Sequence, residues 1–335
     1  MMIYNIDKLF EAAALKGHVC AGLDTCADYV PPEERRKSAC DAQAVLLFNK
    51  ALIDALFDVV ACFKVQIAYY EEMGIEGLRA YSETLKYIRK KGCLAIADIK
   101  RGDIADTAER YARAHFSGDF EADFVTLSPY MGMDSCEPWL KHARNNGKGA
   151  FVLMRTSNKG MRDFQYQITM SKEQGAENNE KIKNNIFVNH KKTEVNKNKR
   201  LYCVVGDKLA ELARIDKGNY GYGAFGAVVG CTERDEAAEI RKNYPELFFL
   251  IPGYGAQGGG AQDAALLLRD GNGGVVNASR SIITAWINTV NNEQLTENKS
   301  SIDNLFAAEA ARKAAIKMRD EILDFQRNSV RRETI

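Results

Sequence analysis

The chain has 335 residues, of which 46% are hydrophobic, and its formal net charge is +1. This length and apolar content allow a large buried core, which excludes a wholly disordered chain and permits one large α/β domain or two smaller ones. A net charge so close to zero gives no whole-chain attraction for nucleic acid or for an anionic membrane, so neither is expected as a partner.

The ends and the sulfur-containing residues of the sequence predict a soluble cytoplasmic protein. Residues 1–8 lack the basic segment and apolar run of a signal peptide, and no later stretch is long enough to span a membrane. The eight cysteines form no C-x-x-C pair, and Cys20, Cys62 and Cys231 lie in or beside apolar runs, so we expect reduced thiols in the core. The four histidines are not at metal-ligand spacing, so no bound metal is expected.

Short apolar runs alternate along the chain with segments of helical periodicity. Most of the runs are hydrophobic throughout, which is typical of parallel strands covered on both faces. The eight predicted strands are residues 18–23, 59–67, 93–99, 123–127, 149–154, 225–229, 247–251 and 274–277. Helical segments between them include residues 41–57, 77–91, 106–116 and 233–243. This alternation predicts a single (β/α)₈ TIM-barrel domain.

Two segments depart from the alternation. Residues 159–200 are rich in Asn, Lys, Glu and Gln and have no sustained apolar period. We interpret them as a solvated insertion in the loop after the fifth strand. The alternative is a lid over the barrel mouth, because that loop opens on the catalytic face. Residues 303–325 carry apolar side chains at roughly helical spacing, which predicts a packing helix that closes the barrel.

Charged side chains fall at the ends of three successive predicted strands. Asp24 ends the first, Lys64 lies inside the second, and Asp98 and Lys100 end the third. Strand side chains alternate with a period of two, so Asp98 and Lys100 are expected to point the same way. Because the carboxyl ends of barrel strands converge on one site, this joint placement favours a catalytic cluster. A purely structural pair between Lys64 and Asp98 is the alternative.

Two further groups of polar residues follow predicted strands. Asp103 lies at the start of the helix after the third strand, and Thr107 follows four residues later on the same helical face. The fifth strand is followed by Thr156, Ser157 and Asn158, whose hydroxyl and amide groups can hydrogen-bond the polar edge of a heterocycle. An ordinary turn after a strand has the same composition, so both interpretations stay open.

A glycine-rich loop follows the seventh predicted strand. Residues 251–260 read Ile-Pro-Gly-Tyr-Gly-Ala-Gln-Gly-Gly-Gly and contain the G-x-G-x-x-G pattern of dinucleotide sites. Only one further strand follows, however, and residues 277–280 at its end read Asn-Ala-Ser-Arg, without the acidic residue that would bind a ribose. A phosphate cradle of backbone N–H groups, with Arg280 as a cationic clamp, fits the pattern better.

Together these motifs resemble a known enzyme family. The combination of Asp98-x-Lys100-x-x-Asp103 with the Pro-Gly-x-Gly-Ala-Gln-Gly-Gly loop and the Asn-Ala-Ser-Arg run is similar to the orotidine 5′-monophosphate decarboxylase family, in its bacterial-type second subgroup. The resemblance covers about residues 19–283, excluding the insertion. It implies decarboxylation of orotidine 5′-monophosphate to uridine 5′-monophosphate without a cofactor or metal. This reaction is the final step of de novo pyrimidine nucleotide synthesis.

The resemblance also implies a role for each matched residue. Asp24 and Lys64 would hold ribose hydroxyls, Asp98 would face the substrate carboxylate, and Lys100 would donate the proton. The family's active sites form at a homodimer interface, which implies that Asp103 and Thr107 enter the neighbouring subunit's site. The remaining substrate contacts would come from Thr156 or Ser157 at the pyrimidine, and from Pro252, Gly255, Gln257, Ser279 and Arg280 around the phosphate.

Three alternatives stay open from the sequence. The D-x-K-x-x-D motif is shared with related sugar-phosphate barrels, so a Mg²⁺-dependent decarboxylase or aldolase is one of them, although Lys64 suits a metal-free site better. The second is a catalytically silent phosphate-binding barrel that acts as a scaffold. The third concerns partners, because the enzyme of the preceding step, orotate phosphoribosyltransferase, could form a complex with this chain.

Overall fold

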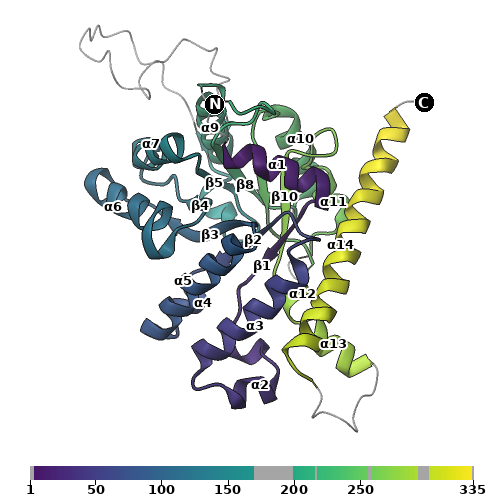
Figure 1. Cartoon of the computed structure of the whole chain (residues 1–335). Coiled ribbons are helices and arrows are strands. Elements are labelled where there is room, and N and C mark those ends of the chain that lie inside the picture. Colours follow the sequence, from purple (N-terminus) through teal and green to yellow (C-terminus); the bar gives the residue numbers. More distant parts are fainter. Residues whose placement is uncertain (1–3, 170–198, 216, 256–257, 293–301, 334–335) are drawn as a thin grey trace, which may run out of the picture.

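Eight parallel strands form a closed barrel with helices on its outer side (Figure 1). The computed structural model describes residues 4–169, 199–215, 217–255, 258–292 and 302–333. Around the barrel the order is β1, β10, β9, β8, β5, β4, β3, β2, and the pairing of β1 with β10 closes it. The strands are β1 Val19–Gly22, β2 Cys62–Gln66, β3 Leu94–Arg101, β4 Phe124–Leu127, β5 Gly149–Arg155, β8 Phe225–Val229, β9 Phe249–Ile251 and β10 Gly274–Ala278. The predicted (β/α)₈ barrel is therefore confirmed.

Continuous apolar sequence marks these strands because both of their faces are covered. Every residue of β1, β4, β8 and β10 is buried, by helices on the outside and by other strands' side chains on the inside. All eight predicted strands coincide with barrel strands. The largest difference in their ends is in the second, which was predicted over residues 59–67 and is observed as Cys62–Gln66.

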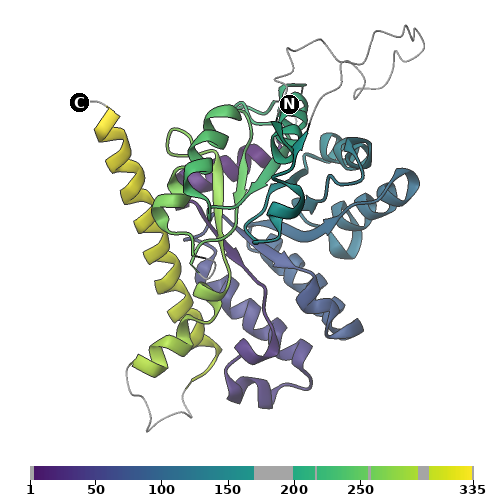
Figure 2. The ribbon, with the colours of Figure 1, turned by 180° about the vertical axis from the view of Figure 1, so that it is seen from behind.

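The helices cover the outer face of the barrel (Figures 1 and 2). On α5 the buried side chains include Tyr81, Leu85 and Ile88, which repeat at the spacing of one helical face. The helices are α1 Asn5–Lys16, α2 Pro32–Lys37, α3 Asp41–Leu56, α4 Ala68–Glu71, α5 Gly74–Lys90, α6 Ala105–Phe116, α7 Glu137–Asn146, α8 Met161–Phe164, α9 Leu201–Ile215, α10 Arg234–Asn243, α11 Ala261–Ala265, α12 Arg280–Ile283, α13 Ala285–Asn292 and α14 Asn304–Glu333.

The first helix, α1, closes the amino-terminal end of the barrel, a feature that the sequence analysis did not identify. Its Ile6 and Leu9 belong to one apolar cluster with Phe124 and other side chains of the barrel interior. The Asn5 side chain donates a hydrogen bond to Asp123 Oδ1 at 3.0 Å, just before β4. The opposite end, where the strands have their carboxyl termini, is therefore left as the mouth.

The C-terminal helix, α14, packs on the outside of the barrel against α3, α11, α12 and α13 (Figures 1 and 2). Small residues at Ala307, Ala311 and Ala315 are fully buried in this contact, and Met318 and Ile322 continue the same face. Because the helix also contacts β1, it covers the side of the barrel where the first and last strands meet.

Only the two ends of the predicted insertion, residues 159–200, lie within the described residues. The strands β6 Ile168–Thr169 and β7 Lys199–Arg200 pair as a short antiparallel ribbon. The rest, residues 170–198, lies outside the described part of the chain, so the choice between a solvated loop and a lid stays open.

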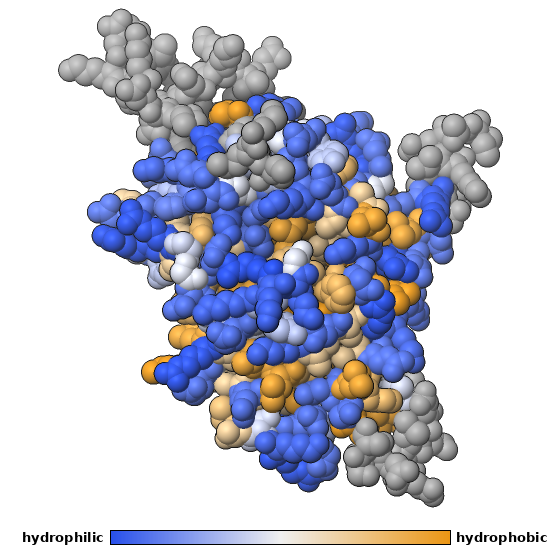
Figure 3. Space-filling view, in the orientation of Figure 1, coloured by the Kyte–Doolittle hydropathy of each residue, from blue (hydrophilic) through white to orange (hydrophobic). Residues whose placement is uncertain are grey.

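Hydrophilic side chains cover most of the face seen in Figure 3, and apolar side chains form small groups among them. All eight cysteines are free thiols, and five of them, including Cys20, Cys62 and Cys231, are buried, as predicted. Within the described residues, no helix has both the length and the apolar character needed to cross a bilayer.

Candidate active site

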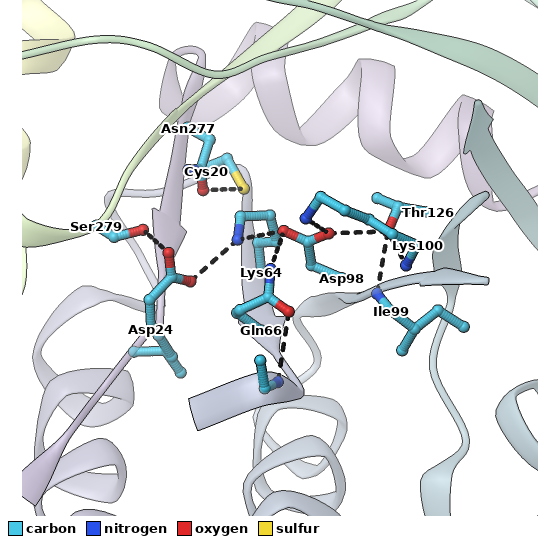
Figure 4. A network of polar contacts seen from close by, with 12 residues as sticks. Cys20, Asp24, Lys64, Gln66, Asp98, Ile99, Lys100, Thr126, Asn277 and Ser279 are labelled. Carbon is cyan, nitrogen blue, oxygen red and sulfur yellow. Dashed lines mark hydrogen bonds and ion pairs between the residues drawn. The ribbon is translucent and has the colours of Figure 1, made fainter. Parts of the chain in front are cut away.

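Four charged side chains alternate in sign across the barrel mouth (Figure 4). Lys64 Nζ lies 3.0 Å from Asp24 Oδ1 and 2.8 Å from Asp98 Oδ2. Lys100 Nζ lies 2.6 Å from Asp98 Oδ1. The structure therefore brings together Asp24, Lys64, Asp98 and Lys100 from the first three strands in an unbroken row. We call these four residues the charge network.

Lys64 and Asp98, at the centre of the charge network, are buried, which strengthens the attraction between their charges. Lys64 is 4% exposed and Asp98 is 5% exposed. Burial alone would raise the pKa of Asp98, but the positive charges of Lys64 and Lys100 outweigh it and hold that pKa below its usual range. Burial would likewise lower the pKa of Lys64, but Asp24 and Asp98 raise it above its usual value. Both groups are therefore charged at neutral pH.

The Asp98 carboxylate has a full set of hydrogen bonds. Its Oδ1 accepts from Lys100 Nζ at 2.6 Å and from Thr126 Oγ1 at 2.8 Å. Its Oδ2 accepts from Lys64 Nζ at 2.8 Å and from Gln66 Nε2 at 3.0 Å. A carboxylate has about four acceptor positions, so this one is held in a fixed orientation.

Sequence analysis missed both neutral donors to this carboxylate. Gln66 lies two residues after Lys64 on β2, on the same side of the strand, so the period of two could have identified it. Thr126 is a single polar residue inside the apolar run of β4, and threonine is common in strands for its shape alone.

The third strand is irregular where it carries its charged residues. The pairing of β3 with β4 shifts register between Ala97 and Arg101, and Lys100 has a φ of +44°. Asp98 and Lys100 do point toward each other, as expected, but regular alternation is not the reason. A bulge with a left-handed residue turns the Lys100 side chain back onto Asp98.

Asp103 and Thr107 stay outside the charge network of this chain. Asp103 Oδ1 accepts a hydrogen bond from the N–H of Ile104 at 2.8 Å, and no ion pair joins Asp103 to any described residue. Thr107 is exposed on the first turn of α6, which begins at Ala105. In a single chain Thr107 is therefore exposed and Asp103 is partly exposed.

A second contact extends the network toward the last strand. The Ser279 hydroxyl donates a hydrogen bond to Asp24 Oδ2 at 2.9 Å (Figure 4). Gly22 lies beneath this contact, where a Cβ atom would come within 1.9 Å of the Ser279 Oγ. Only glycine leaves room for Ser279 here, so Gly22 allows the end of β10 to come within hydrogen-bonding distance of Asp24.

The glycine-rich loop after β9 has the backbone that its sequence predicts. Gly253, Gly255 and Gly258 have φ values of +103°, +72° and +97°, which residues with a Cβ rarely adopt. The pattern thus serves a tight turn in a barrel and does not mark a dinucleotide-binding fold. The Gly255 N–H bonds the Gly259 carbonyl at 2.8 Å, so this amide is already used inside the loop. The predicted ligand Gln257 lies outside the described residues.

Arg280 lies beside this loop, directly after the last strand, β10. Its side chain is exposed at the start of α12 and forms no ion pair or hydrogen bond with any described residue. Tyr29 and Tyr69 lie within its electrostatic reach: burial raises the pKa of both phenols, and the charge of Arg280 opposes that rise. Neither tyrosine was identified from the sequence.

The residues after β5 face the glycine-rich loop. Ser157 is so close to Gly253 that a Cβ on this glycine would lie 3.3 Å from the Ser157 Cβ. Thr156 is held from the other side by Gln165, whose Oε1 accepts from the Thr156 N–H and whose Nε2 donates to the Thr156 hydroxyl, both at 2.9 Å. The described start of the predicted insertion, residues 159–169, therefore contacts the mouth through Gln165, which directly follows α8.

The fold and the site define a class of protein. This class is the (β/α)₈ barrel with a buried network of charges at its mouth, beside a glycine-rich loop and an arginine that has no partner among the described residues. Residues 18–291 match the model of the orotidine 5′-phosphate decarboxylase / HUMPS family, and the chain belongs to this family. The resemblance identified from the sequence is confirmed.

Individual proteins give the same result. The chain is 50% identical over 317 residues to the orotidine 5′-phosphate decarboxylase of Clostridium acetobutylicum, a match that covers 95% of this chain and 98% of that protein. The structure of Leishmania donovani OMP decarboxylase matches with a TM-score of 0.68 at 28% identity, covering 97% of this chain and 99% of that chain. Leishmania donovani UMP synthase matches with a TM-score of 0.66 at 28% identity, covering 95% of this chain and 57% of that chain.

Proposed function

We propose that the protein decarboxylates orotidine 5′-monophosphate to uridine 5′-monophosphate without a cofactor, as the last step of de novo pyrimidine nucleotide synthesis. The observation that carries the proposal is the charge network, with Lys100 Nζ 2.6 Å from a buried, ionised Asp98, in a chain of this family. Lys100 is the proton donor in this proposal.

The chemistry needs a cation in this position. When the bond between C6 and the carboxylate breaks, CO₂ leaves and the electron pair stays on C6. Without a cofactor to delocalise that pair, the protein must stabilise it electrostatically. A cation beside C6 becomes more favourable as the charge moves onto carbon, which lowers the energy of the transition state more than that of the bound substrate. The Lys100 ammonium then transfers its proton to C6 and completes the product.

Asp98 would act on the bound substrate before the bond breaks. Its carboxylate is ionised, and its four hydrogen bonds prevent it from turning away. Placed against the substrate carboxylate, it repels that group, and the repulsion disappears as neutral CO₂ departs. The positive charges of Lys64 and Lys100 hold the pKa of Asp98 below its usual range, so Asp98 does not take up the Lys100 proton.

The remaining residues would bind the parts of the substrate that do not react. Asp24 and Lys64 would hold the ribose hydroxyls, and Thr156 or Ser157 the pyrimidine edge. The phosphate would contact the loop around Pro252, Gly255 and Gln257, together with the backbone at Ser279 and the Arg280 guanidinium. Binding energy from the phosphate would serve to order the loops and exclude water from the reacting carbon.

We further propose a homodimer in which Asp103 and Thr107 complete the neighbour's site. The support is that Asp103 makes no ion pair with any described residue and that large apolar side chains are exposed at the next residue and after the neighbouring strand, β4. Ile104 is 49% exposed, and Tyr130 and Met131, after β4, are 81% and 48% exposed. A groove of about 940 Å³ between α6 and α7 begins at Ile104 and provides a surface for a second copy.

Cytoplasmic location and association with orotate phosphoribosyltransferase complete the proposal. The support for an association is the match with UMP synthase, a longer protein of which this chain covers 57%. Co-elution of the two purified enzymes at micromolar concentration would support it, and separate elution would count against it.

The proposal is tested with purified protein and orotidine 5′-monophosphate. The wild type should remove the absorbance of the orotate ring, and Lys100→Ala should lower turnover by at least about 10⁴-fold, since one residue would supply both the charge and the proton. Binding of uridine 5′-monophosphate to the variant should persist. Lys90→Ala, which changes an exposed lysine on α5, is the matched control and should keep full activity. Substantial activity of Lys100→Ala would overturn the assignment of the proton donor.

A further inference from the structure

We propose that Thr126 is a positioning residue that holds Asp98 and Lys100 in their reactive arrangement through a single buried hydroxyl group. The inference rests on the proposed role of Lys100 as proton donor and goes beyond it. Thr126 lies on β4, opposite the irregular part of β3, and is 1% exposed (Figure 4).

The Thr126 hydroxyl replaces backbone acceptors that β4 cannot offer to the irregular part of β3. In the pairing of β3 with β4, Ala97 lies opposite Val125 and Arg101 lies opposite Leu127. Three residues of β3 therefore face Thr126 alone, and their N–H groups cannot all bond to the β4 backbone. Thr126 Oγ1 accepts from the N–H of Ile99 at 3.0 Å and from the N–H of Lys100 at 2.9 Å.

The direction of each hydrogen bond follows from chemistry. Asp98 is ionised, so its Oδ1 only accepts, and the proton on the 2.8 Å bond must belong to Thr126. The two backbone N–H groups only donate, so they take the two lone pairs of the hydroxyl. A hydroxyl has one proton and two lone pairs, and all three are used. The group therefore has one orientation and links the Asp98 carboxylate to the backbone of Lys100.

This link matters because the Lys100 backbone is strained. Its φ of +44° is unfavourable for a residue with a Cβ, and such a conformation persists only where neighbouring groups fix it. Without the Thr126 hydroxyl, the buried N–H of Ile99 and the half-buried N–H of Lys100 lose their acceptor, and the bulge is free to relax. The Lys100 ammonium would then move away from Asp98 and from the reacting carbon.

The effect should fall on the chemical step. Displacing a reacting group by about 1 Å can cost about 100-fold in rate. The described groups proposed to hold phosphate and ribose, by contrast, come from β1, β2 and the segments that follow β1, β9 and β10, and none of them makes a hydrogen bond to Thr126. Loss of the hydroxyl should therefore lower kcat and leave binding of the product nearly unchanged.

The test compares Thr126→Val, which keeps the shape and removes the hydroxyl, with Thr126→Ser, which keeps the hydroxyl. We expect Thr126→Val to lower kcat about 100-fold and to change the dissociation constant of uridine 5′-monophosphate by less than about 3-fold. Thr126→Ser should stay within about 5-fold of the wild-type kcat. Ser82→Ala removes another buried hydroxyl, one that donates to the Asp119 carbonyl at 2.8 Å far from the mouth, and should not change kcat.

The outcomes separate this inference from the proposed function. If Lys100→Ala is inactive but folded Thr126→Val keeps kcat within about 3-fold of the wild type, only the positioning role is overturned. Equal losses in Thr126→Ser and Thr126→Val would also overturn it, because the hydroxyl would then not be the cause. If the wild type does not decarboxylate the nucleotide, or Lys100→Ala stays active, both proposals fail. If Thr126→Val does not fold, Thr126→Cys takes its place in the test. A thiol is a weaker hydrogen-bonding group than a hydroxyl, so the kcat of Thr126→Cys should be clearly below that of Thr126→Ser, and an equal kcat would overturn the positioning role.

Discussion

Replacing Lys64 by methionine is the perturbation for which the structure gives the clearest energetic expectation. Methionine keeps the apolar stem of the side chain but removes an ammonium group that lies 3.0 Å from Asp24 and 2.8 Å from Asp98. Asp98, which is 5% exposed, then keeps a buried negative charge with fewer partners. Removing one partner of a buried ion pair costs about 3–5 kcal/mol. We expect the lower end, about 3 kcal/mol, because Asp98 keeps Lys100 and Asp24 is partly hydrated.

Thermal unfolding measures this loss. The unfolding entropy is about 2.1 cal/mol/K per residue, so in this 335-residue chain a loss of 1 kcal/mol lowers Tm by about 1.4 °C, and Lys64→Met should lower Tm by about 4 °C. Adding Asp98→Asn in the same chain should recover part of the loss, because the unmatched charge is then gone. An unchanged Tm in Lys64→Met, or a further decrease in the double variant, would refute the electrostatic account of this pair.

The same pair predicts how stability depends on pH. The pKa of Asp98 is lower in the folded than in the unfolded chain, so its contribution is present above the unfolded value of about 3.9 and is lost as pH falls through the folded value. The difference in Tm between the wild type and Lys64→Met should therefore shrink in acid. A difference in Tm that grows as pH falls would show that folding does not lower the pKa of Asp98.

Two further predictions concern substrate binding and the dimer. Arg280 is exposed and unpaired among the described residues, so Arg280→Ala should leave Tm within about 2 °C. The variant should raise KM at least about 100-fold, because charge-assisted hydrogen bonds to the phosphate contribute about 1.5–3 kcal/mol each. An unchanged KM would exclude Arg280 from the phosphate site. Mixing inactive Asp98→Ala with inactive Asp103→Ala should restore up to about a quarter of the activity, since each mixed dimer has one intact site. No recovery after confirmed subunit exchange would contradict a role of Asp103 in the neighbour's site.

The sequence predicted the barrel well because its strands are buried on both faces. Continuous apolar runs such as residues 225–229 are typical of strands covered on both faces, and eight short runs, most of them apolar throughout, in alternation with helices leave few other folds. The helix α1 was missed because its buried residues Ile6, Leu9 and Ala13 form a narrow apolar stripe in a short segment. Such a stripe indicates a helix but not that it closes the end of a barrel.

The sequence predicted the charged residues of the candidate site but not the neutral residues that hydrogen-bond to them. Charged residues are conspicuous in apolar strands, so Lys64 and Asp98 were identified from type and position alone. The Thr126 hydroxyl gives no such signal, because threonine suits a strand with or without a hydrogen bond. The bulge at Lys100 depends on how β3 pairs with β4, which no local pattern in the sequence specifies.

The proposed function assigns the decarboxylation of the nucleotide to the charge network and the proton at C6 to Lys100. The most direct measurement is single-turnover decarboxylation by the wild type and by Lys100→Ala in D₂O, with the hydrogen at C6 of the product determined by NMR. The account predicts that the wild type places one deuterium at C6 and that the variant forms no detectable product while it still binds uridine 5′-monophosphate. Rapid formation of the same deuterated product by Lys100→Ala would contradict it.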